Sequence, residues 1–295
     1  MAIFYNEKEP RAWWRLLMFV FITVFGVVVL HALVVYIHSP KVGMLRGMTP
    51  GGLLAVQELA FAIPAMLAGL VMGSIEHRPI TSYGLVVGAG QPRLILGGIV
   101  WGVGMMTALI LLIRALGGVQ FSGLAIHGSV LLKSAALYGI GFLLVGFFEE
   151  FTFRGYMQTI LGEWIGFWRA AVILSALFGA VHFLNGGETW VGALMAAGFG
   201  VVSCLALERT GSLWLSIGMH AGFDYAETFI FGVPDGGFPA KNALMNATLH
   251  GPKWLTGGIV GPEASVMAFV MLAGAFVLIW MMYSPRRPLA IPSPA

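Results

Sequence analysis

The sequence predicts an all-α, polytopic membrane protein with about eight transmembrane helices in one bundle. Of its 295 residues, 58% are hydrophobic and only 10% are charged. The mean hydropathy of +0.88 is well above that of soluble globular domains. A helix that crosses the hydrocarbon core needs about 20 apolar residues, and the chain contains repeated runs of this length.

The apolar runs give eight candidate spans in order along the chain. The first is expected to be a retained helix rather than a cleaved signal, because no small-residue cleavage pattern follows it. Trp13 and Trp14 precede it as expected interfacial anchors. The connectors NGGE and ERTGS predict tight helical hairpins on either side of the sixth run. The runs are approximately 16–38, 53–75, 94–120, 135–161, 168–184, 189–207, 213–231 and 264–283.

These spans divide the chain into five segments. We expect the segment 232–263, which is rich in Gly and Pro, to be either a connecting loop or a lid or lateral gate over a cavity. The segments are a polar amino-terminal stretch at 1–15, three helices with their loops at 16–134, a four-helix core at 135–231, the loop at 232–263, and the last helix with its tail at 264–295.

The distribution of positive charge predicts the orientation. Eight spans place both termini on one side, and that side carries more Lys and Arg than the opposite loops, so both termini are expected in the cytoplasm and the protein in the cell (inner) membrane. The cations are scattered singly, which does not indicate a nucleic-acid partner. The terminal side holds Lys8, Arg11, Arg15, Arg78, Arg93, Arg169, Arg209, Arg286 and Arg287, and the opposite loops hold Lys41, Arg46, Lys133, Lys241 and Lys253.

Three of the spans carry a His, Glu or Asp deep in apolar sequence. An ionisable residue in lipid costs about 2.5–3.5 kcal/mol and usually marks a functional interior. The fourth span contains the stretch FFEEFTFRGYM, the fifth ends with LFGAVHF, and the seventh contains SIGMHAGFDYAE. The candidate site residues in these stretches are Glu149, Glu150, Arg154, His182, His220 and Asp224, with Glu227 as a weaker candidate.

Helix geometry predicts different roles for the two glutamates. Residues four apart lie on one face of a helix, so Glu150 is predicted to pair with Arg154 and to leave Glu149 available for chemistry. His220 and Asp224 share a face in the same way. Two alternatives stay open, namely ion pairs and hydrogen bonds that only hold helices together, and a proton or ion relay in a transporter or channel.

A carboxylate and an imidazole can hold a water molecule and remove its proton, while further donors stabilise the oxyanion that forms when the water attacks a carbonyl. One glutamate and two histidines also match a catalytic zinc site, so the candidate metal ligands are Glu149, His182 and His220. The sequence contains no HExxH, and its single cysteine, Cys204, excludes a site built from several cysteines. The sequence therefore establishes no cofactor, and zinc is the candidate metal.

At these residues the chain resembles the CPBP intramembrane proteases (ABI domain), which include the type II CAAX prenyl endopeptidases. The motifs of that family are EExxxR, FxxxH and HxxxN or a near variant, in this order on separate helices. This sequence has Glu149, Glu150 and Arg154, then Phe178 and His182, then His220 and Asp224, and the resemblance covers about residues 135–231.

The resemblance implies a role for each residue. Glu149 would be the general base, His182 would hold the attacking water, and His220 would help to stabilise the oxyanion, while Glu150 and Arg154 order the site. Asp224 departs from the frequent Asn, and an ionised Asp cannot donate to an oxyanion, so it either is protonated or orients His220.

We therefore expect an intramembrane endopeptidase that hydrolyses a peptide bond near the membrane surface. Its expected partners are the lipid bilayer and a peptide or membrane-protein substrate, whose identity and prenylation the sequence does not indicate. The alternatives are the transporter or channel and a non-catalytic membrane scaffold of the same fold. The sequence does not indicate the oligomeric state.

Overall fold

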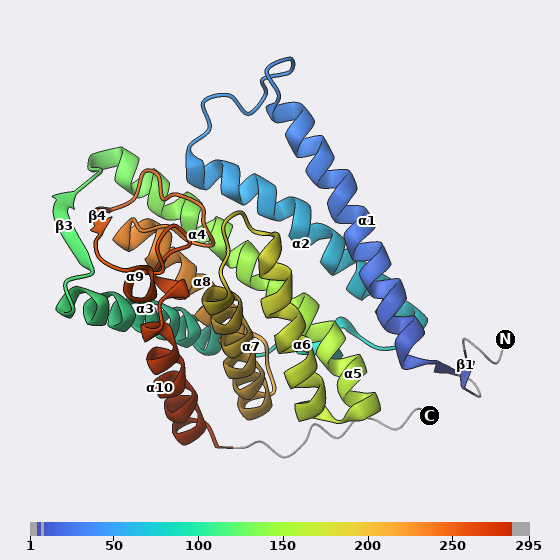
Figure 1. The fold of residues 1–295 in the computed structure, drawn as a ribbon. Coiled ribbons are helices and arrows are strands. Elements are labelled where there is room, and N and C mark those ends of the chain that lie inside the picture. The colour runs from blue at the N-terminus through green and yellow to red at the C-terminus, as the bar shows by residue number, and fades with distance from the viewer. Residues whose placement is uncertain (1–4, 7–8, 285–295) are drawn as a thin grey trace.

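A computed structural model describes residues 5–6 and 9–284 as a bundle of helices with two small antiparallel β-pairs (Figure 1). Lys8, Arg286 and Arg287, which entered the charge comparison, lie outside the described residues. The α-helices are α1 (Ala12–His38), α2 (Pro50–Ile75), α3 (Gln91–Ala115), α4 (Gly128–Glu150), α5 (Gln158–Ile165), α6 (Phe167–Val181), α7 (Trp190–Thr210), α8 (Trp214–Asp224), α9 (Lys253–Thr256) and α10 (Met267–Met282). The short helices are η1 (Ile80–Tyr83), η2 (Phe151–Met157), η3 (His182–Leu184), η4 (Tyr225–Phe231) and η5 (Pro262–Ala264). The strands are β1 (Tyr5–Asn6), β2 (Glu9–Pro10), β3 (Val119–Leu124) and β4 (Met245–Leu249).

The all-α polytopic fold is confirmed, whereas the count of eight spans is not. Among the described residues, six helical segments are long and apolar enough to cross a membrane. The last helix, α10, has only 16 residues. The seventh predicted run forms α8 and η4, which carry His220, Asp224 and Glu227 and are almost entirely buried. Because this segment contacts other helices rather than lipid, it can contain more polar residues than the lipid-facing helices.

Two of the predicted spans, the third and the fourth, differ in length from the helices in the structure. The third run was predicted to continue to residue 120, but α3 ends at Ala115 and β3 begins at Val119. The fourth run forms a continuous helical segment from Gly128 to Ile165, which is longer than predicted at both ends. The predicted loop 232–263 supplies β4, which pairs antiparallel with β3 and so joins the two segments.

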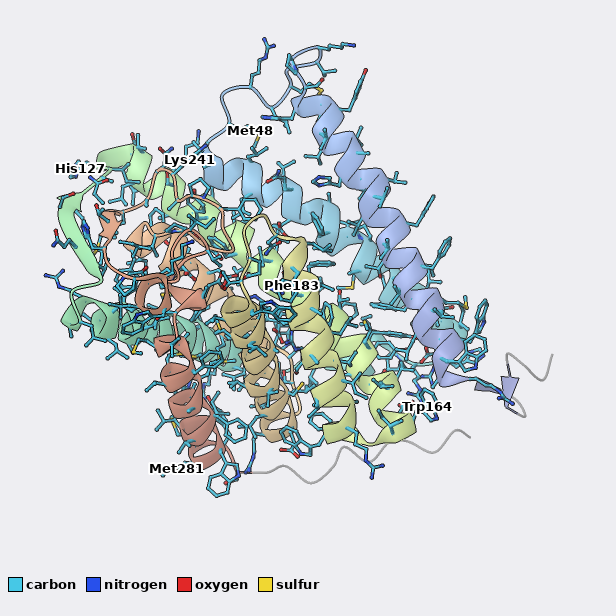
Figure 2. The ribbon with its side chains drawn as sticks, in the orientation of Figure 1. Met48, His127, Trp164, Phe183, Lys241 and Met281 are labelled. Atoms are coloured by element: carbon cyan, nitrogen blue, oxygen red, sulfur yellow. The ribbon has the colours of Figure 1, made fainter. Side chains whose placement is uncertain are left out.

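The outer surface of the bundle is apolar, as a membrane protein requires. Large apolar side chains are exposed on α1, α6 and α10, for example Phe21 (70%) and Val172 (60%). Trp164 and Met281 lie toward the lower side of the bundle in Figure 2, while Met48, His127 and Lys241 lie toward the opposite, loop-rich side. The exposed apolar belt therefore lies between two ends that carry the connections.

Helix α8 packs against α3 through glycines on both helices. A Cβ atom on Gly98 or Gly102 of α3 would lie 2.2 Å or 2.0 Å from a backbone carbonyl oxygen of α8. A Cβ atom on Gly218 or Gly222 of α8 would lie 2.2 Å or 2.4 Å from a carbonyl oxygen of α3. Glycines spaced four apart are a common means of close helix approach in membranes. The close approach of α8 to α3 therefore depends on these four glycines having no side chain.

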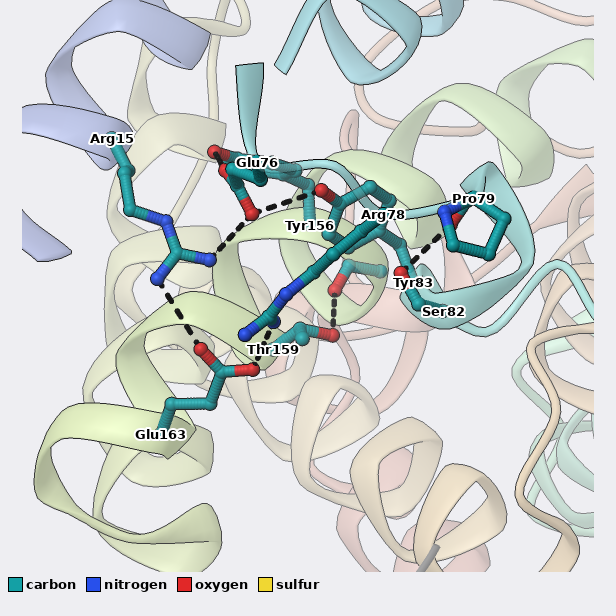
Figure 3. Close-up of polar contacts among 10 residues, drawn as sticks. Arg15, Glu76, Arg78, Pro79, Ser82, Tyr83, Tyr156, Thr159 and Glu163 are labelled. Atoms are coloured by element: carbon teal, nitrogen blue, oxygen red, sulfur yellow. Dashed lines mark hydrogen bonds and ion pairs between the residues drawn. The ribbon is translucent and has the colours of Figure 1, made fainter. Parts of the chain in front are cut away.

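A second set of contacts fixes the other end of the long fourth segment (Figure 3). The buried carboxylate of Glu76 accepts hydrogen bonds from Arg15 Nη2 at 2.5 Å, Tyr156 Oη at 2.5 Å and Tyr83 Oη at 3.0 Å. Glu163 pairs with Arg15 and with Arg78. These groups come from α1, the turn that follows α2, η1, η2 and α5, so they hold the helix that carries the EExxxR motif against the amino-terminal helices.

Removing one hydrogen bond from this network is expected to destabilise the fold measurably. Tyr156→Phe should lower the free energy of unfolding by about 2 kcal/mol, because a hydrogen bond to a charged group is lost in a buried site. The measurement is denaturant-induced unfolding of the purified protein in mixed micelles. Tyr36→Phe is the matched control, since Tyr36 is 61% exposed on α1. Equal stability of the two variants would contradict a stabilising role for the Tyr156 contact.

Candidate active site

The two helices that carry the acidic site residues both change their winding directly after those residues. Segment η2 is a π-helix that begins at Phe151, immediately after Glu150. Segment η4 is a π-helix that begins at Tyr225, immediately after Asp224. Such π-turns within α-helices occur frequently at functional sites. The residue spacing was interpreted on a uniform α-helix, and neither π-turn was predicted from the sequence.

The predicted pair of Glu150 and Arg154 forms in spite of the π-helix. Arg154 Nη1 donates to Glu150 Oε1 at 3.2 Å, and both side chains are almost fully buried. Ser203 of α7 also donates to Glu150, at 3.4 Å. The guanidinium carbon of Arg154 lies 4.0 Å from the centroid of the Phe178 ring. A Cβ atom on Gly200 would lie 2.3 Å from Arg154 Nη2, so α7 leaves room for the arginine.

His220 lies between the two glutamates and contacts both. Its Nδ1 lies 3.0 Å from Glu150 Oε1, and its Nε2 lies 3.5 Å from Glu149 Oε2 and 3.6 Å from Asp224 Oδ2. Because ionised carboxylates only accept hydrogen bonds, Nδ1 donates to Glu150 and Nε2 faces two further acceptors. A protonated imidazole satisfies this arrangement best, and His220 then carries a hydrogen that it can donate to a developing negative charge.

His182 presents only one of its nitrogens to the site. Its Nδ1 lies 2.7 Å from the carbonyl oxygen of Phe178, which can only accept, so this nitrogen carries the hydrogen. In the neutral imidazole, Nε2 is then free to accept a hydrogen bond from water. The Phe178 ring meets the rings of both His182 and His220 edge-on, with centroids 4.6 Å and 6.2 Å apart. The phenylalanine of the FxxxH motif thus holds both histidines and Arg154 in place.

A cavity of about 30 Å³ lies beside these residues. Since one water molecule needs about 10–15 Å³ of such volume, it has room for about two waters. His182, His220 and Asp224 supply polar groups to its wall, together with Glu263 from η5. The remainder of the wall is apolar and consists of Phe178, Met195, Ala196, Phe199 and Phe223.

The structure places all six candidate residues in one region, although they do not make equal contacts. Glu149, Glu150, Arg154, His220 and Asp224 are linked by direct pairings. His182 joins them through Phe178 and through the shared cavity. Glu149 is about one quarter exposed, and its Oε2 accepts no hydrogen bond within the described part of the chain. Glu149 is therefore the accessible one of the two glutamates, with its Oε2 facing His220 Nε2 at 3.5 Å.

The predicted zinc ligands do not form a compact donor set. Zinc binds its ligands at about 2.0–2.2 Å, so the donor atoms of one site lie within about 4 Å of each other. Within the described residues, the group whose ligand atoms all lie within 4.8 Å of one another is a different one, Glu227, Asp235 and Glu263. Glu149, His182 and His220 thus do not fit one zinc ion in this arrangement, and zinc stays a prediction.

Sequence analysis missed Glu263, Ser203 and Phe199 as residues of this region. Glu263 lies in the stretch GPE, and nothing in the sequence distinguished it from other loop acids. Its side chain lines the cavity, so the segment after η4 forms part of the site rather than only a connection. The Phe199 ring centroid lies 5.1 Å from that of His220. A serine and a phenylalanine within an apolar helix carry no sequence signal of such a contact.

Two acidic groups of the segment after η4 are perturbed by their surroundings. Burial is the largest cause, and it raises the pKa of Asp235 to about 6 against the opposing effect of a hydrogen bond from Thr228. Burial followed by repulsion from Asp235 raises the pKa of Glu263 well above its usual value. Both groups lie outside the membrane-spanning segments.

Comparison with known proteins supports the family resemblance that the three motifs indicate. Residues 131–226 match the family model of the type II CAAX prenyl endopeptidase Rce1-like. No curated protein and no solved structure matches the chain. The match begins before Glu149 and ends after Asp224, so all three motifs lie within it. The similarity to this protease family over about a third of the chain is thus confirmed.

Proposed function

We propose that the protein is an intramembrane endopeptidase that hydrolyses a peptide bond near the membrane surface with a water molecule activated by Glu149 and His182. The observation that carries the proposal is a cavity of water size lined by His182, His220 and Asp224. Glu149 lies next to this cavity wall, with its Oε2 3.5 Å from His220 Nε2. The family match at residues 131–226 supports the reaction class.

In this proposal the attacking water lies in the cavity and donates to Nε2 of His182, whose other nitrogen is held by Phe178. Glu149 is the general base, because it is partly exposed and its Oε2, 3.5 Å from His220 Nε2, accepts no hydrogen bond from the described residues. It takes the proton of the water as the oxygen attacks the carbonyl carbon, and it then delivers a proton to the leaving amine.

His220 stabilises the oxyanion of the tetrahedral intermediate. Its Nδ1 is anchored by Glu150, which is itself neutralised by Arg154, so the imidazole is fixed before substrate binds. Asp224 faces Nε2 of the same ring at 3.6 Å and acts through it, keeping the imidazole protonated and oriented. This account removes the need for Asp224 to donate to the oxyanion itself.

Replacement of His182 tests whether the histidine holds the attacking water. His182→Ala should lower the rate of cleavage of a reporter membrane substrate by about 10²-fold, the lower end of general acid–base effects. The assay uses the purified full chain reconstituted in liposomes. His250→Ala is the matched control, because His250 is exposed in the loop after β4. A His182→Ala protein with the turnover of the control would refute the proposed role.

The same preparation separates the proteolytic proposal from a transporter or channel. A transporter would show Glu149-dependent ion flux across the sealed vesicles without any cleavage. Zinc dependence is tested by chelator treatment followed by elemental analysis of the active protein. Full activity at a zinc content far below one ion per chain would eliminate a zinc mechanism.

A further inference from the structure

A second group of carboxylates lies beside the proposed active site, on segments that sequence analysis treated as connections. It consists of Glu227 on η4, Asp235 on the following turn, and Glu263 on η5. One oxygen from each lies within 4.8 Å of the other two. These residues are 36 positions apart at most in the chain, and the group joins three separate segments.

Partners among the described residues do not balance the negative charge of this group. Asp235 Oδ2 accepts from Thr228 Oγ1 at 3.0 Å, Glu263 Oε1 accepts from the Gly236 amide at 2.6 Å, and Glu227 Oε1 accepts from the Glu263 amide at 3.4 Å. All of these donors are neutral. Within the described part of the chain, no Lys, Arg or His side chain forms an ion pair with any of the three carboxylates.

Glu227 provides an independent indication of a ligand. Its side chain is completely buried, yet its Oε2 has no hydrogen-bond partner among the described residues. A buried carboxylate oxygen without a partner costs free energy unless a cation or a proton compensates for it. Asp235 and Glu263 are only half-buried, so the group is open to solvent on their side.

We propose that Glu227, Asp235 and Glu263 bind a divalent cation of the hard, oxygen-preferring class, with Ca²⁺ as the best fit. All donors are carboxylate oxygens, which is the ligand type that Ca²⁺ and Mg²⁺ select. Ca²⁺ bonds of about 2.3–2.6 Å allow ligand oxygens up to about 5 Å apart, which covers the separations seen here. Mg²⁺ requires oxygens closer together and retains more water.

The site has a clear structural consequence. A bound cation would join η4, the turn at Asp235 and η5, and would so fix the segment that carries Glu263 against the cavity. Gly261 allows these segments to approach, because a Cβ atom there would lie 2.1 Å from Pro234 O and 2.9 Å from Glu227 Oε1. Cation binding thus would position one wall of the cavity without contact to the reacting groups.

The test is the titration of the full chain with Ca²⁺ alone, after removal of divalent ions with a chelator and desalting in detergent. Isothermal titration calorimetry should give one Ca²⁺ per chain. Asp235→Asn and Glu263→Gln should each weaken binding by roughly tenfold or more, because affinity follows the number of charged ligands. Glu208→Gln is the matched control, since Glu208 lies on α7 and bonds Trp168 instead.

Thermal unfolding of the same proteins, measured with and without Ca²⁺, provides a second test that also applies to a variant of lower stability. Ca²⁺ should raise the unfolding midpoint of the wild type and of Glu208→Gln, and should shift Asp235→Asn much less. In the chelator, Asp235→Asn should unfold no earlier than the wild type, because the substitution removes a repulsive charge. Absence of Ca²⁺ binding by the wild type would overturn the proposal. So would binding of Ca²⁺ by Asp235→Asn and Glu263→Gln as tightly as by the wild type.

Discussion

Glu149→Gln is expected to lower the rate of peptide-bond cleavage by about 10²–10⁴-fold, the range that a positioned general base contributes. The amide has the size of the carboxylate but cannot accept the proton of the attacking water. Substrate binding should be preserved, so the loss falls on kcat rather than on KM. The measurement is steady-state cleavage of the reporter substrate by the full chain in liposomes.

The folded state of this variant should be unaffected, which makes the result easy to interpret. Glu149 Oε2 accepts no hydrogen bond among the described residues, and the side chain is about one quarter exposed. Neutralising it leaves the buried imidazole of His220 with Glu150 and Asp224 as acidic partners. Glu208→Gln serves as the control for the loss of one acid on a helix. Near-normal turnover of a correctly inserted Glu149→Gln protein would refute the hydrolytic mechanism.

Gly102→Ala is expected to lower cleavage by about 10²-fold without altering any polar residue, because a displacement of about 1 Å at a reacting group has an effect of this size. The added Cβ atom would lie 2.0 Å from the Met219 carbonyl oxygen. Helix α8 must move away from α3 to relieve this overlap, and His220 moves with it. The overpacking should also lower the free energy of unfolding by about 1–3 kcal/mol.

Gly104→Ala provides the matched control on the same helix. A Cβ atom there meets nothing within 4 Å. Replacing an exposed helical glycine by alanine usually stabilises a helix by about 1 kcal/mol, so this variant should be fully active and at least as stable as the wild type. Equal activity of Gly102→Ala and Gly104→Ala would contradict the view that close packing of α3 and α8 positions His220.

Glu149→Gln and Gly102→Ala test different parts of the proposed active site. In the proposed mechanism Glu149 supplies the reactive oxygen, whereas the glycine contact sets the position of the imidazole, which lies 3.5 Å from Glu149. An effect of Gly102→Ala on KM alone would indicate a substrate-binding change instead. A loss confined to kcat would place the effect on the catalytic geometry.

The sequence by itself determined the class of the fold and indicated the candidate site residues. Apolar runs of membrane-crossing length predict helices because lipid cannot satisfy free backbone groups. Charged residues within such runs are costly, so Glu149, His182 and His220 could be recognised without a structure. The spacing of Glu150 and Arg154 predicted their ion pair, because residues four apart share a helix face.

Only the tertiary structure decided how the separate helices meet. The sequence gives no distance between α4 and α8, and therefore could not show that His220 contacts both glutamates. It could not separate α8 and η4 from the lipid-facing helices, because burial against α3 depends on contacts between distant segments. Nor could it indicate that Asp235 and Glu263 approach Glu227, since no helical period links residues in loops. Local periodicity is encoded along the chain, whereas a site made from several helices and loops exists only where packing brings them together.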